Sequence, residues 1–187
     1  TKAYASIGQV CDSFEYKIDN PNEESIGELC VKGPSVFQGY YKNKEDTAKV
    51  FDKDGFFHTG DLVKEDKQKR LYITGRCKNV IILDNGKNIC PEEIEHVVEI
   101  SQNFLKDIVC YQYNDNGKDI IVVGIWTDNE YNSEDLKQLF IDINKKLPMH
   151  KKINYVNISD TEYEKTSTKK IKRNNLEKYH NQKGFYL

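Results

Sequence analysis

Apolar and polar residues alternate over short segments in the first part of the chain, which is the pattern of half-buried β-strands. The segments with this pattern are 10–18, 27–32 and 70–74. Turn-forming clusters separate them: Asn20-Pro21-Asn22, Gly33-Pro34 and Asp52-Lys53-Asp54-Gly55. One short helix is expected over residues 43–50. The first part is therefore predicted to be mainly β.

The second part changes to a helical spacing of apolar residues. Pro91-Glu92-Glu93 is a favourable helix start, because proline is tolerated in the first turn and acids there complement the helix dipole. A second helix is predicted from a Ser133-Glu134-Asp135 cap to Pro148, with Leu136 and Phe140 among the residues of its apolar face. Further elements are expected in the segments 106–113 (strand), 118–126 (strand), 153–158 (strand) and 173–179 (helix).

The change near residue 76 predicts two parts and an α+β fold class. Residues 1–75 form the β-rich part, and residues 76–79 connect it to the second part. Residues 80–187 are expected to form a small α+β domain, with a three-stranded sheet and flanking helices. The Asn114–Gly117 turn is of the hairpin type and joins two of its strands.

Composition narrows the class of protein. The 28 basic and 30 acidic residues give a net charge of -2, which offers no general attraction to nucleic acid or an anionic membrane. No apolar stretch approaches the ~20 residues of a transmembrane helix, so a cytoplasmic protein, free or peripheral to a membrane, is expected. The five cysteines lack metal-binding or redox spacing and are expected to be free thiols, and the sequence predicts no metal site.

Four motifs carry candidate chemistry, and each has a plain structural alternative. Gly27-Glu28-Leu29 with the Gly33–Tyr41 stretch is typical of turns. His58-Thr59-Gly60-Asp61-Leu62 combines a glycine, which permits close approach of a ligand, with a carboxylate that can accept hydrogen bonds from ribose hydroxyls. Its alternative is a loop with an Asx turn.

The other two motifs place cations at exposed turns. Gly75–Ile82 holds Arg76 and Lys78 at the expected domain boundary, and it leads through Asp84-Asn85-Gly86 into the helix that starts at Pro91. The segment 164–173 brings several lysines before the last helix. A surface hairpin and a basic helix cap, or a nucleic-acid patch, are the alternatives.

In their order and spacing, the four motifs resemble the adenylate-forming superfamily of acyl-CoA synthetases, luciferases and peptide-synthetase adenylation domains. The matching strings are GELxVxGPxVxxGYY, HTGD, GRxKNxI followed by NGxxxxPEEIE, and TxTKKIKR. The chain is most similar to the C-terminal portion of bacterial-type long-chain fatty acyl-CoA synthetases. The missing initiating Met agrees with a piece of a longer protein.

The resemblance implies the fold and the nucleotide-binding residues. Residues 1–75 would be the last subdomain of the N-terminal adenylation domain, a distorted barrel. Residues 76–79 would be a hinge, and residues 80–187 a mobile C-terminal domain. Asp61 would bind the ribose hydroxyls, Arg76 the ribose and phosphate region, and Ile73 would pack near the nucleotide.

The resemblance also implies the remaining site residues. Lys78 would be the hinge residue, Gly86 would let the pantetheine arm of CoA pass, and Lys170 would be the adenylation lysine. The family usually has glycine before that lysine, where this chain has Lys169, so Lys169 and Lys165 remain alternatives for the role.

The implied substrates are fatty acid, ATP and CoA, with AMP and pyrophosphate as products and Mg²⁺ required in the full-length enzyme through ligands outside this chain. The other partner is the N-terminal part of the same protein, without which the chain is expected to be inactive. Two alternatives remain: an adenylation protein that loads a carrier protein, and a non-catalytic binding module of the same fold. Neither a nucleic-acid partner nor a transmembrane segment is expected.

Overall fold

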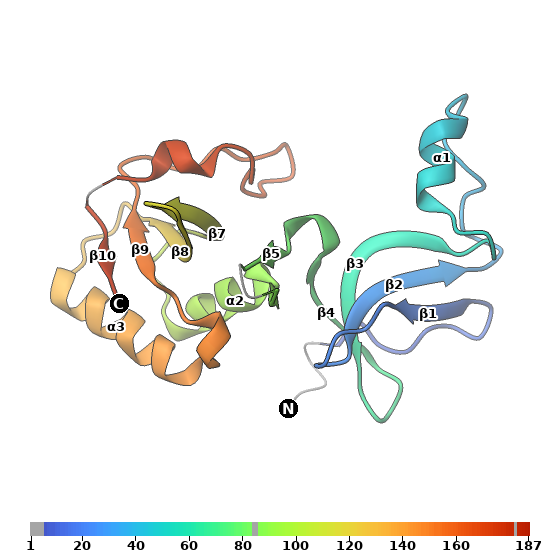
Figure 1. Cartoon of the computed structure of the whole chain (residues 1–187), viewed down its shortest axis with the longest axis horizontal. Helices are drawn as coiled ribbons and strands as arrows, with labels where there is room; N and C mark the ends of the chain where they lie inside the picture. The colour runs from blue at the N-terminus through green and yellow to red at the C-terminus, as the bar shows by residue number, and fades with distance from the viewer. Residues whose placement is uncertain (1–5, 84–85, 182) are drawn as a thin grey trace. The chain divides into compact units, whose positions relative to one another are not determined.

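The computed structural model describes residues 6–83, 86–181 and 183–187. The chain divides into two compact units, Thr1–Asn79 and Val80–Leu187. Figure 1 labels their elements.

The first unit is an antiparallel sheet of four strands in the order β1-β2-β3-β4. The strands are β1 (Glu15–Asp19), β2 (Ile26–Lys32), β3 (Phe57–Glu65) and β4 (Leu71–Arg76). Each pairs with the next one in sequence. Cys30 and Val63 are fully buried and Leu71 is nearly so. The four strands agree with the expected β-rich character of this part of the chain.

Two features of this unit differ from the sequence-based expectation. No strand was expected over residues 57–65, and a loop with an Asx turn was the structural alternative for the 58–62 motif, yet Gly60 and Asp61 both lie within β3 and Asp61 pairs with Arg76. Among the described residues the sheet is open, with β1 and β4 as its outer strands, rather than the expected distorted barrel. Four short strands are too few to close a barrel around side chains.

One short helix, α1 (Lys44–Val50), projects from the loop between β2 and β3. The side chain of Asn43 caps it by accepting a hydrogen bond from the amide of Asp46. None of its residues is buried. Its start therefore follows from capping chemistry rather than from packing.

The second unit packs two helices, α2 (Pro91–Ser101) and α3 (Ser133–Lys146), with a sheet ordered β10-β9-β8-β7. The sheet strands are β7 (Asp107–Asp115), β8 (Lys118–Trp126), β9 (Tyr155–Ile158) and β10 (Phe185–Tyr186). A separate pair is formed by β5 (Ile81–Ile82) and β6 (Asn88–Ile89). The described residues also contain the 3-10 turns η2 (Cys77–Asn79) in the first unit, and η3 (Met149–Lys151) and η4 (Leu176–Tyr179) in the second.

The buried core of the second unit lies between its helices and its sheet. Ile94 and Val98 of α2, Phe140 of α3 and Val123 of β8 are fully buried in one cluster. The strands β7 and β8 join through a tight turn in which Asn116 and Gly117 both have positive φ. Asn-Gly is the sequence that this kind of hairpin favours.

The α+β class is confirmed, and the details of the second unit are refined. The sheet has four strands where three were predicted, because the two-residue β10 adds to β9. The side chain of Asn132, rather than Ser133, caps α3. The last helix is shorter than expected and is the 3-10 turn η4. A two-residue strand and a single turn carry too little periodic pattern to be detected in a sequence.

Among the described residues, no helix has the length and apolar character that crossing a bilayer requires. The five cysteines are free, as predicted.

Candidate functional site

The strand β3 carries the first part of the candidate site. Asp61 lies directly opposite Arg76 of β4 in the sheet register. Its Oδ1 lies 2.7 Å from Nε of Arg76, and about half of the arginine side chain remains exposed. The carboxylate is thus held beside a cation while it keeps access to solvent. Such a pair can present acceptors to ribose hydroxyls and a positive charge to a phosphate.

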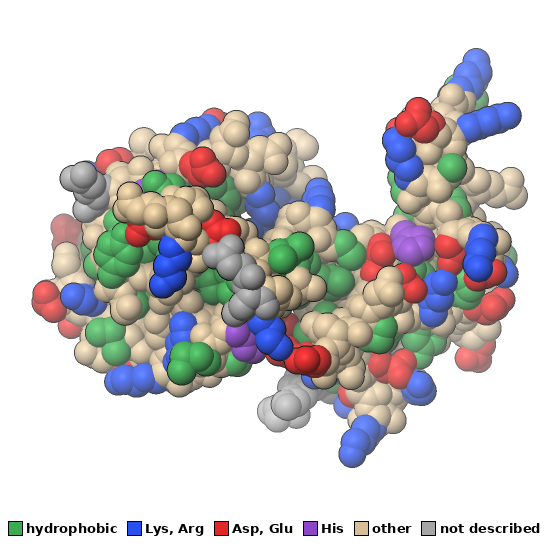
Figure 2. Space-filling model, in the orientation of Figure 1, with side chains coloured by type: hydrophobic (Ala, Val, Ile, Leu, Met, Phe, Trp, Pro, Cys, Tyr) green, Lys and Arg blue, Asp and Glu red, His purple; other side chains and the backbone are tan. Residues whose placement is uncertain are grey.

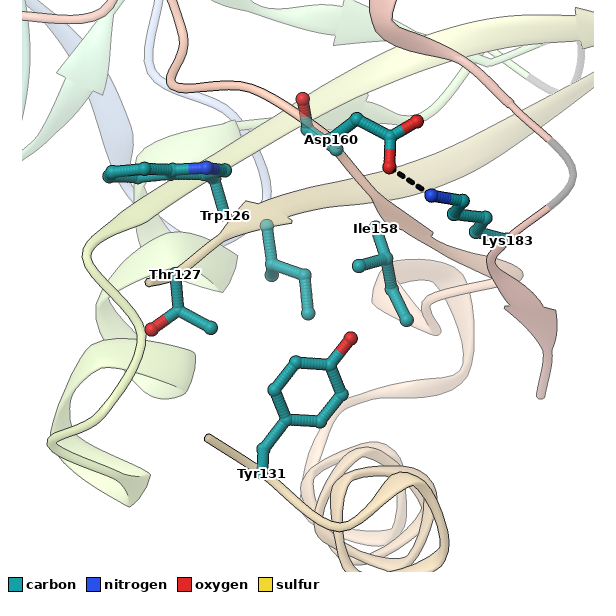
Figure 3. A pocket seen from close by; sticks show the side chains of 8 residues that line it. Trp126, Thr127, Tyr131, Ile158, Asp160 and Lys183 are labelled. Carbon is teal, nitrogen blue, oxygen red and sulfur yellow. Dashed lines mark hydrogen bonds and ion pairs between the residues drawn. The ribbon is translucent and has the colours of Figure 1, made fainter. Parts of the chain in front are cut away.

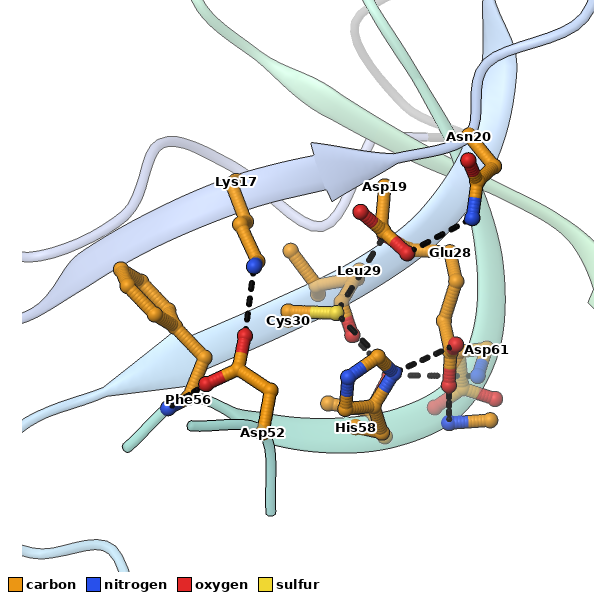
Figure 4. A network of polar contacts seen from close by, with 12 residues as sticks. Lys17, Asp19, Asn20, Glu28, Leu29, Cys30, Asp52, Phe56, His58 and Asp61 are labelled. Atoms are coloured by element: carbon orange, nitrogen blue, oxygen red, sulfur yellow. Dashed lines mark hydrogen bonds and ion pairs between the residues drawn. The ribbon is translucent and has the colours of Figure 1, made fainter. Parts of the chain in front are cut away.

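A half-buried polar network fixes the backbone just before Asp61 (Figure 4). Glu28 of β2 accepts a hydrogen bond from the amide of Gly60 at 2.9 Å through Oε1, and its Oε2 lies 2.8 Å from Nδ1 of His58. The Thr59 hydroxyl donates to the carbonyl oxygen of Leu29 at 2.7 Å. Three successive residues of β3 are therefore tied to β2.

The sequence analysis did not identify the role of Glu28, because Gly27-Glu28-Leu29 was interpreted as part of a turn-forming stretch. The positive φ of 73° at Gly60 favours glycine, since a Cβ is strained there. The signal that could have found Glu28 is its position in the same motif set as Gly60, on a neighbouring strand.

The same network is the one group among the described residues with ligand atoms close enough to share a metal ion. Atoms of Glu28, Cys30 and His58 lie within 4.8 Å of one another. Burial raises the pKa of the Cys30 thiol to about 11, which keeps it protonated at neutral pH. A thiol and an imidazole suit softer ions than Mg²⁺, which prefers oxygen ligands. Mg²⁺ therefore does not fit this cluster.

Two further predicted residues lie at the end of the first unit. Ile73 is on β4, opposite Val63, with half of its side chain exposed. Lys78 is an exposed residue of the turn η2, directly after β4. An exposed isoleucine is available to a ligand, and a single 3-10 turn is a short connection before the second unit.

Gly86 lies between β5 and β6 in the second unit. Its φ is 75°, its amide donates to the carbonyl oxygen of Leu83 at 2.8 Å, and no atom lies within 4 Å of where a Cβ would be. Glycine is thus required here by the backbone, while the space beside it is open. Asp84 and Asn85 of the predicted turn lie outside the described residues.

Lys170 lies on a tight turn in the exposed segment 164–173. The amide of Thr166 donates to the carbonyl oxygen of Lys170 at 2.8 Å, and the amide of Lys169 donates to that of Thr166 at 2.9 Å. Lys169 has a φ of 61°, the left-handed conformation that glycine adopts most easily. This agrees with the position at which the related motif has glycine.

The three candidate lysines differ in what their side chains contact. Lys165 Nζ lies 2.8 Å from Oδ1 of the buried Asp107 and also pairs with Glu162. Those hydrogen bonds, the one to Asp107 first, raise the pKa of Lys165. The side chains of Lys169 and Lys170 are exposed and make no ion pair or hydrogen bond within the described parts of the chain.

A separate open pocket of about 230 Å³ lies beside β8 and β9 of the second unit (Figure 3). Trp126, Tyr131 and Ile158 line it, and an ion pair between Asp160 and Lys183 crosses its rim. None of the predicted site residues borders this pocket. It is therefore no part of the candidate site.

The structure brings Asp61, Arg76 and Ile73 together on one sheet of the first unit. Gly86 and Lys170 lie in the second unit. Basic and acidic side chains are interspersed on the visible face of each unit (Figure 2), without the large basic area that a nucleic-acid surface shows.

The chain is similar in sequence to fatty acid–CoA ligases. It is 45% identical over 94 residues to a long-chain-fatty-acid–CoA ligase of Gallus gallus, covering 50% of this chain and 12% of that protein. It is 31% identical over 140 residues to fatty acyl-CoA synthetase B of Dictyostelium discoideum, covering 70% of this chain and 20% of that protein. The chain matches no protein-family model.

Solved structures share the fold. The O-succinylbenzoate coenzyme A synthetase of Bacillus subtilis, in complex with AMP, superposes with a TM-score of 0.76 at 25% identity, over 92% of this chain and 35% of that one. The chain thus spans about a third of that synthetase, and it spans 12% and 20% of the two ligases.

Proposed function

Because the chain belongs to the adenylate-forming acyl-CoA synthetase family, we propose that it is part of an AMP-forming fatty acid–CoA ligase. In the first half-reaction, the carboxylate attacks the α-phosphorus of ATP, which gives acyl adenylate and releases pyrophosphate. In the second, the thiol of CoA attacks the acyl carbonyl carbon, which gives the thioester and releases AMP and the thiol proton.

The observation that carries this proposal is the state of Lys170. It is exposed and unpaired among the described residues, whereas Lys165 on the same segment is bound to Asp107. A free ammonium group can bridge the attacking carboxylate and the α-phosphate, where negative charge builds up in the transition state. Lys165 would have to give up its ion pair for the same task, which supports Lys170 in the role.

On the nucleotide side, we assign the ribose hydroxyls to Asp61 and the ribose and phosphate region to Arg76. The 2.7 Å pair between them supports this assignment, because it holds both groups at one place on the sheet. Ile73 would pack against the nucleotide with its exposed side chain.

For the second half-reaction, Lys78 serves as the residue at which the backbone turns between two states of the enzyme. A hinge needs only to absorb a change of φ and ψ, and the exposed turn η2 permits one. Gly86 would let the pantetheine arm of CoA pass, and the open space beside its Cα supports this.

We propose a long-chain fatty acid as the acid, because the Gallus gallus relative is a ligase of long-chain fatty acids. Mg²⁺ would accompany ATP, as in the solved complex of the Bacillus subtilis synthetase with ATP and magnesium ion. Its ligands would lie outside this chain. The protein would work in the cytoplasm, free or peripheral to a membrane.

These 187 residues alone should not form acyl adenylate, because they correspond to only a small part of the length of their relatives. Detection of acyl adenylate made by the isolated chain would contradict this point.

The test is ATP–pyrophosphate exchange by the whole protein with a panel of fatty acids. We expect Lys170→Ala to lower exchange by roughly 100- to 1,000-fold, the size typical for loss of one group that stabilises transition-state charge. Thioester formation from preformed acyl adenylate should survive in this variant.

Lys169→Ala is the matched control, since it removes a neighbouring exposed lysine of the same turn. It should keep exchange within about threefold, well below the effect of a lost charge-stabilising group. Unchanged exchange in Lys170→Ala would mean that another residue performs the adenylation step.

A further inference from the structure

We propose that the outer strand β7 and the helix α2 position Lys170 through two ion-pair anchors, one on each side of its turn, so that Asp107 and Glu95 are positioning residues for adenylation. The inference rests on the proposed function of Lys170, and its experiment separates the two claims.

The first anchor precedes the turn. Asp107, at the start of β7, is almost completely buried. Its Oδ2 accepts a hydrogen bond from the amide of Tyr163 at 3.1 Å, and its Oδ1 lies 2.8 Å from Nζ of Lys165. One carboxylate thus holds both the backbone and a side chain of the segment that enters the turn. A buried charge that is paired in this way is costly to disturb.

The second anchor follows the turn. Nη2 of Arg173 donates to both carboxylate oxygens of Glu95 on α2, at 2.9 and 2.8 Å. Its Nη1 donates to the carbonyl oxygen of Cys110 at 3.0 Å. The amide of Cys110 in turn donates to Oε1 of Glu95 at 2.6 Å.

Glu95 and Arg173 together supply the hydrogen-bond partners that a neighbouring strand would give to the backbone of Cys110. β7 ends the sheet among the described strands, so its outward backbone groups need partners. A carboxylate receives the amide hydrogen, and a guanidinium donates to the carbonyl oxygen. Arg173 is therefore fixed in register with β7, three residues after Lys170.

Between the anchors the segment is held by its own backbone. Lys165 and Ile171 form an antiparallel bridge, and the amide of Lys172 donates to the carbonyl oxygen of Glu164 at 2.8 Å. The backbone that carries Lys170 is thus fixed from both sides, while its ammonium group stays free. Figure 1 shows the segment beside β7, between β9 and η4.

The prediction differs from a purely structural role of these ion pairs. Loss of an anchor should displace Lys170, which acts in adenylation, and leave thioester formation untouched. A displacement of about 1 Å is enough to cost 100-fold in rate. A structural role alone would lower both half-reactions together, in proportion to the protein that unfolds.

The experiment uses the whole protein with Glu95→Gln, Arg173→Lys, Lys170→Ala and the control Asp128→Asn. Asp128 belongs to an exposed ion pair with Lys106, 2.6 Å long, outside the segment. Both half-reactions are measured, together with amide hydrogen exchange of residues 164–172.

We expect Glu95→Gln to lower the rate of adenylation by at least tenfold, with KM for ATP and thioester formation within threefold of the parent. Hydrogen exchange in the segment should become at least tenfold faster. Arg173→Lys, which keeps the charge but loses the two-pronged contact, should lie between Glu95→Gln and the parent, and Asp128→Asn should match the parent.

Equal losses of rate in both half-reactions would overturn the anchoring proposal. Unchanged hydrogen exchange of the segment together with an unchanged rate of adenylation in Glu95→Gln and Arg173→Lys would also overturn it. If Lys170→Ala adenylates normally while Glu95→Gln loosens the segment, the anchors exist and the proposed role of Lys170 is wrong. If Lys170→Ala fails and the anchor variants do not, the anchoring proposal alone is wrong.

Discussion

The segment around Asp61 and the segment around Lys170 differ in which part of the candidate site residue is held in place. Asp61 lies inside a sheet and is already paired with Arg76 before any ligand arrives. Lys170 lies on an exposed turn whose backbone is tied down while its side chain is left without a partner among the described residues. Preorganisation acts on the side chain in the first unit and on the backbone in the second.

The comparison extends to the backbone. Each segment has a residue with positive φ next to its candidate site residue: Gly60 at 73° before Asp61, and Lys169 at 61° before Lys170. Glycine adopts this conformation without strain, whereas lysine pays an energetic cost there. The same geometry is thus obtained from the intrinsic preference of glycine in one unit and imposed on lysine in the other.

The strongest way to break the comparison is to remove the preformed carboxylate. Asp61→Ala should raise KM for ATP by roughly 10- to 100-fold, because hydrogen bonds to a charged group contribute about 1.5–3 kcal/mol. The turnover number should change less, in contrast to Lys170→Ala, since Asp61 binds a part of ATP that does not react. Steady-state kinetics of pyrophosphate exchange measure both constants.

Asp66→Asn is the matched control for Asp61, because Asp66 pairs with Arg70 at 2.7 Å in the turn that joins β3 and β4. It should leave KM for ATP unchanged. An equal rise of KM in both variants would point to a general loosening of the sheet.

A smaller effect is expected from the network beneath Asp61. Glu28→Ala removes the acceptor for the Gly60 amide and the partner of His58. An unsatisfied, partly buried donor costs about 1 kcal/mol or more, so KM for ATP should rise roughly fivefold. Glu28→Gln keeps an acceptor oxygen for Gly60 and should recover most of this loss. If Glu28→Ala binds ATP normally, the network does not support Asp61.

The next effect concerns the turn before Lys170. Lys169→Gly relieves a left-handed lysine but increases the freedom of the unfolded chain, so the two terms of about 1 kcal/mol each nearly cancel. Stability and adenylation should stay close to the parent. Lys169→Val, in which a β-branched residue is forced into the same φ, should destabilise the segment by about 1 kcal/mol or more. Denaturant unfolding measures the stability of both variants, and hydrogen exchange of residues 164–172 measures the local effect. If Lys169→Gly and Lys169→Val behave alike, the positive φ of residue 169 does not determine the stability of the segment.

The smallest effect is a difference in pH response between two carboxyl groups. The hydrogen bond from Lys17 lowers the pKa of Asp52 to about 2 in the first unit, while burial raises the pKa of Glu95 in the second. The contribution of Asp52 is present above its unfolded pKa near 3.8 and is lost as the pH falls through 2. For Glu95 the pH dependence has the opposite sign. Because its pKa is higher in the folded state, its contribution to the free energy of unfolding is present below about pH 4.5 and is lost as the pH rises through the raised pKa.

Peptide-resolved hydrogen exchange between pH 2 and 6 tests this difference. Asp52→Asn should weaken the loss of protection of β1 and β2 at low pH, and Glu95→Gln should leave those strands unchanged. The same acid response of β1 and β2 in Asp52→Asn and the parent would contradict the assignment.

The sequence by itself determined the elements with strong local signals and the class of the fold. The helices α2 and α3, the Asn-Gly hairpin and the strand β2 follow from periodicity, capping and turn chemistry, which act between residues close in the chain. The motifs around Asp61, Arg76, Gly86 and Lys170 indicated the family, since their order and spacing are read directly from the chain. The residue roles drawn from that resemblance remain predictions.

Only the tertiary structure decided how the charged groups pair. Asp107 pairs with Lys165, Glu95 with Arg173 and Glu28 with His58, and the two partners of each pair are 30 or more residues apart in the sequence. Exposed and paired lysines look identical in a sequence, because pairing depends on which strand a folded segment lies against. The buried acids of β7 and α2 therefore separate Lys165 from Lys170, a choice that the run of lysines left open.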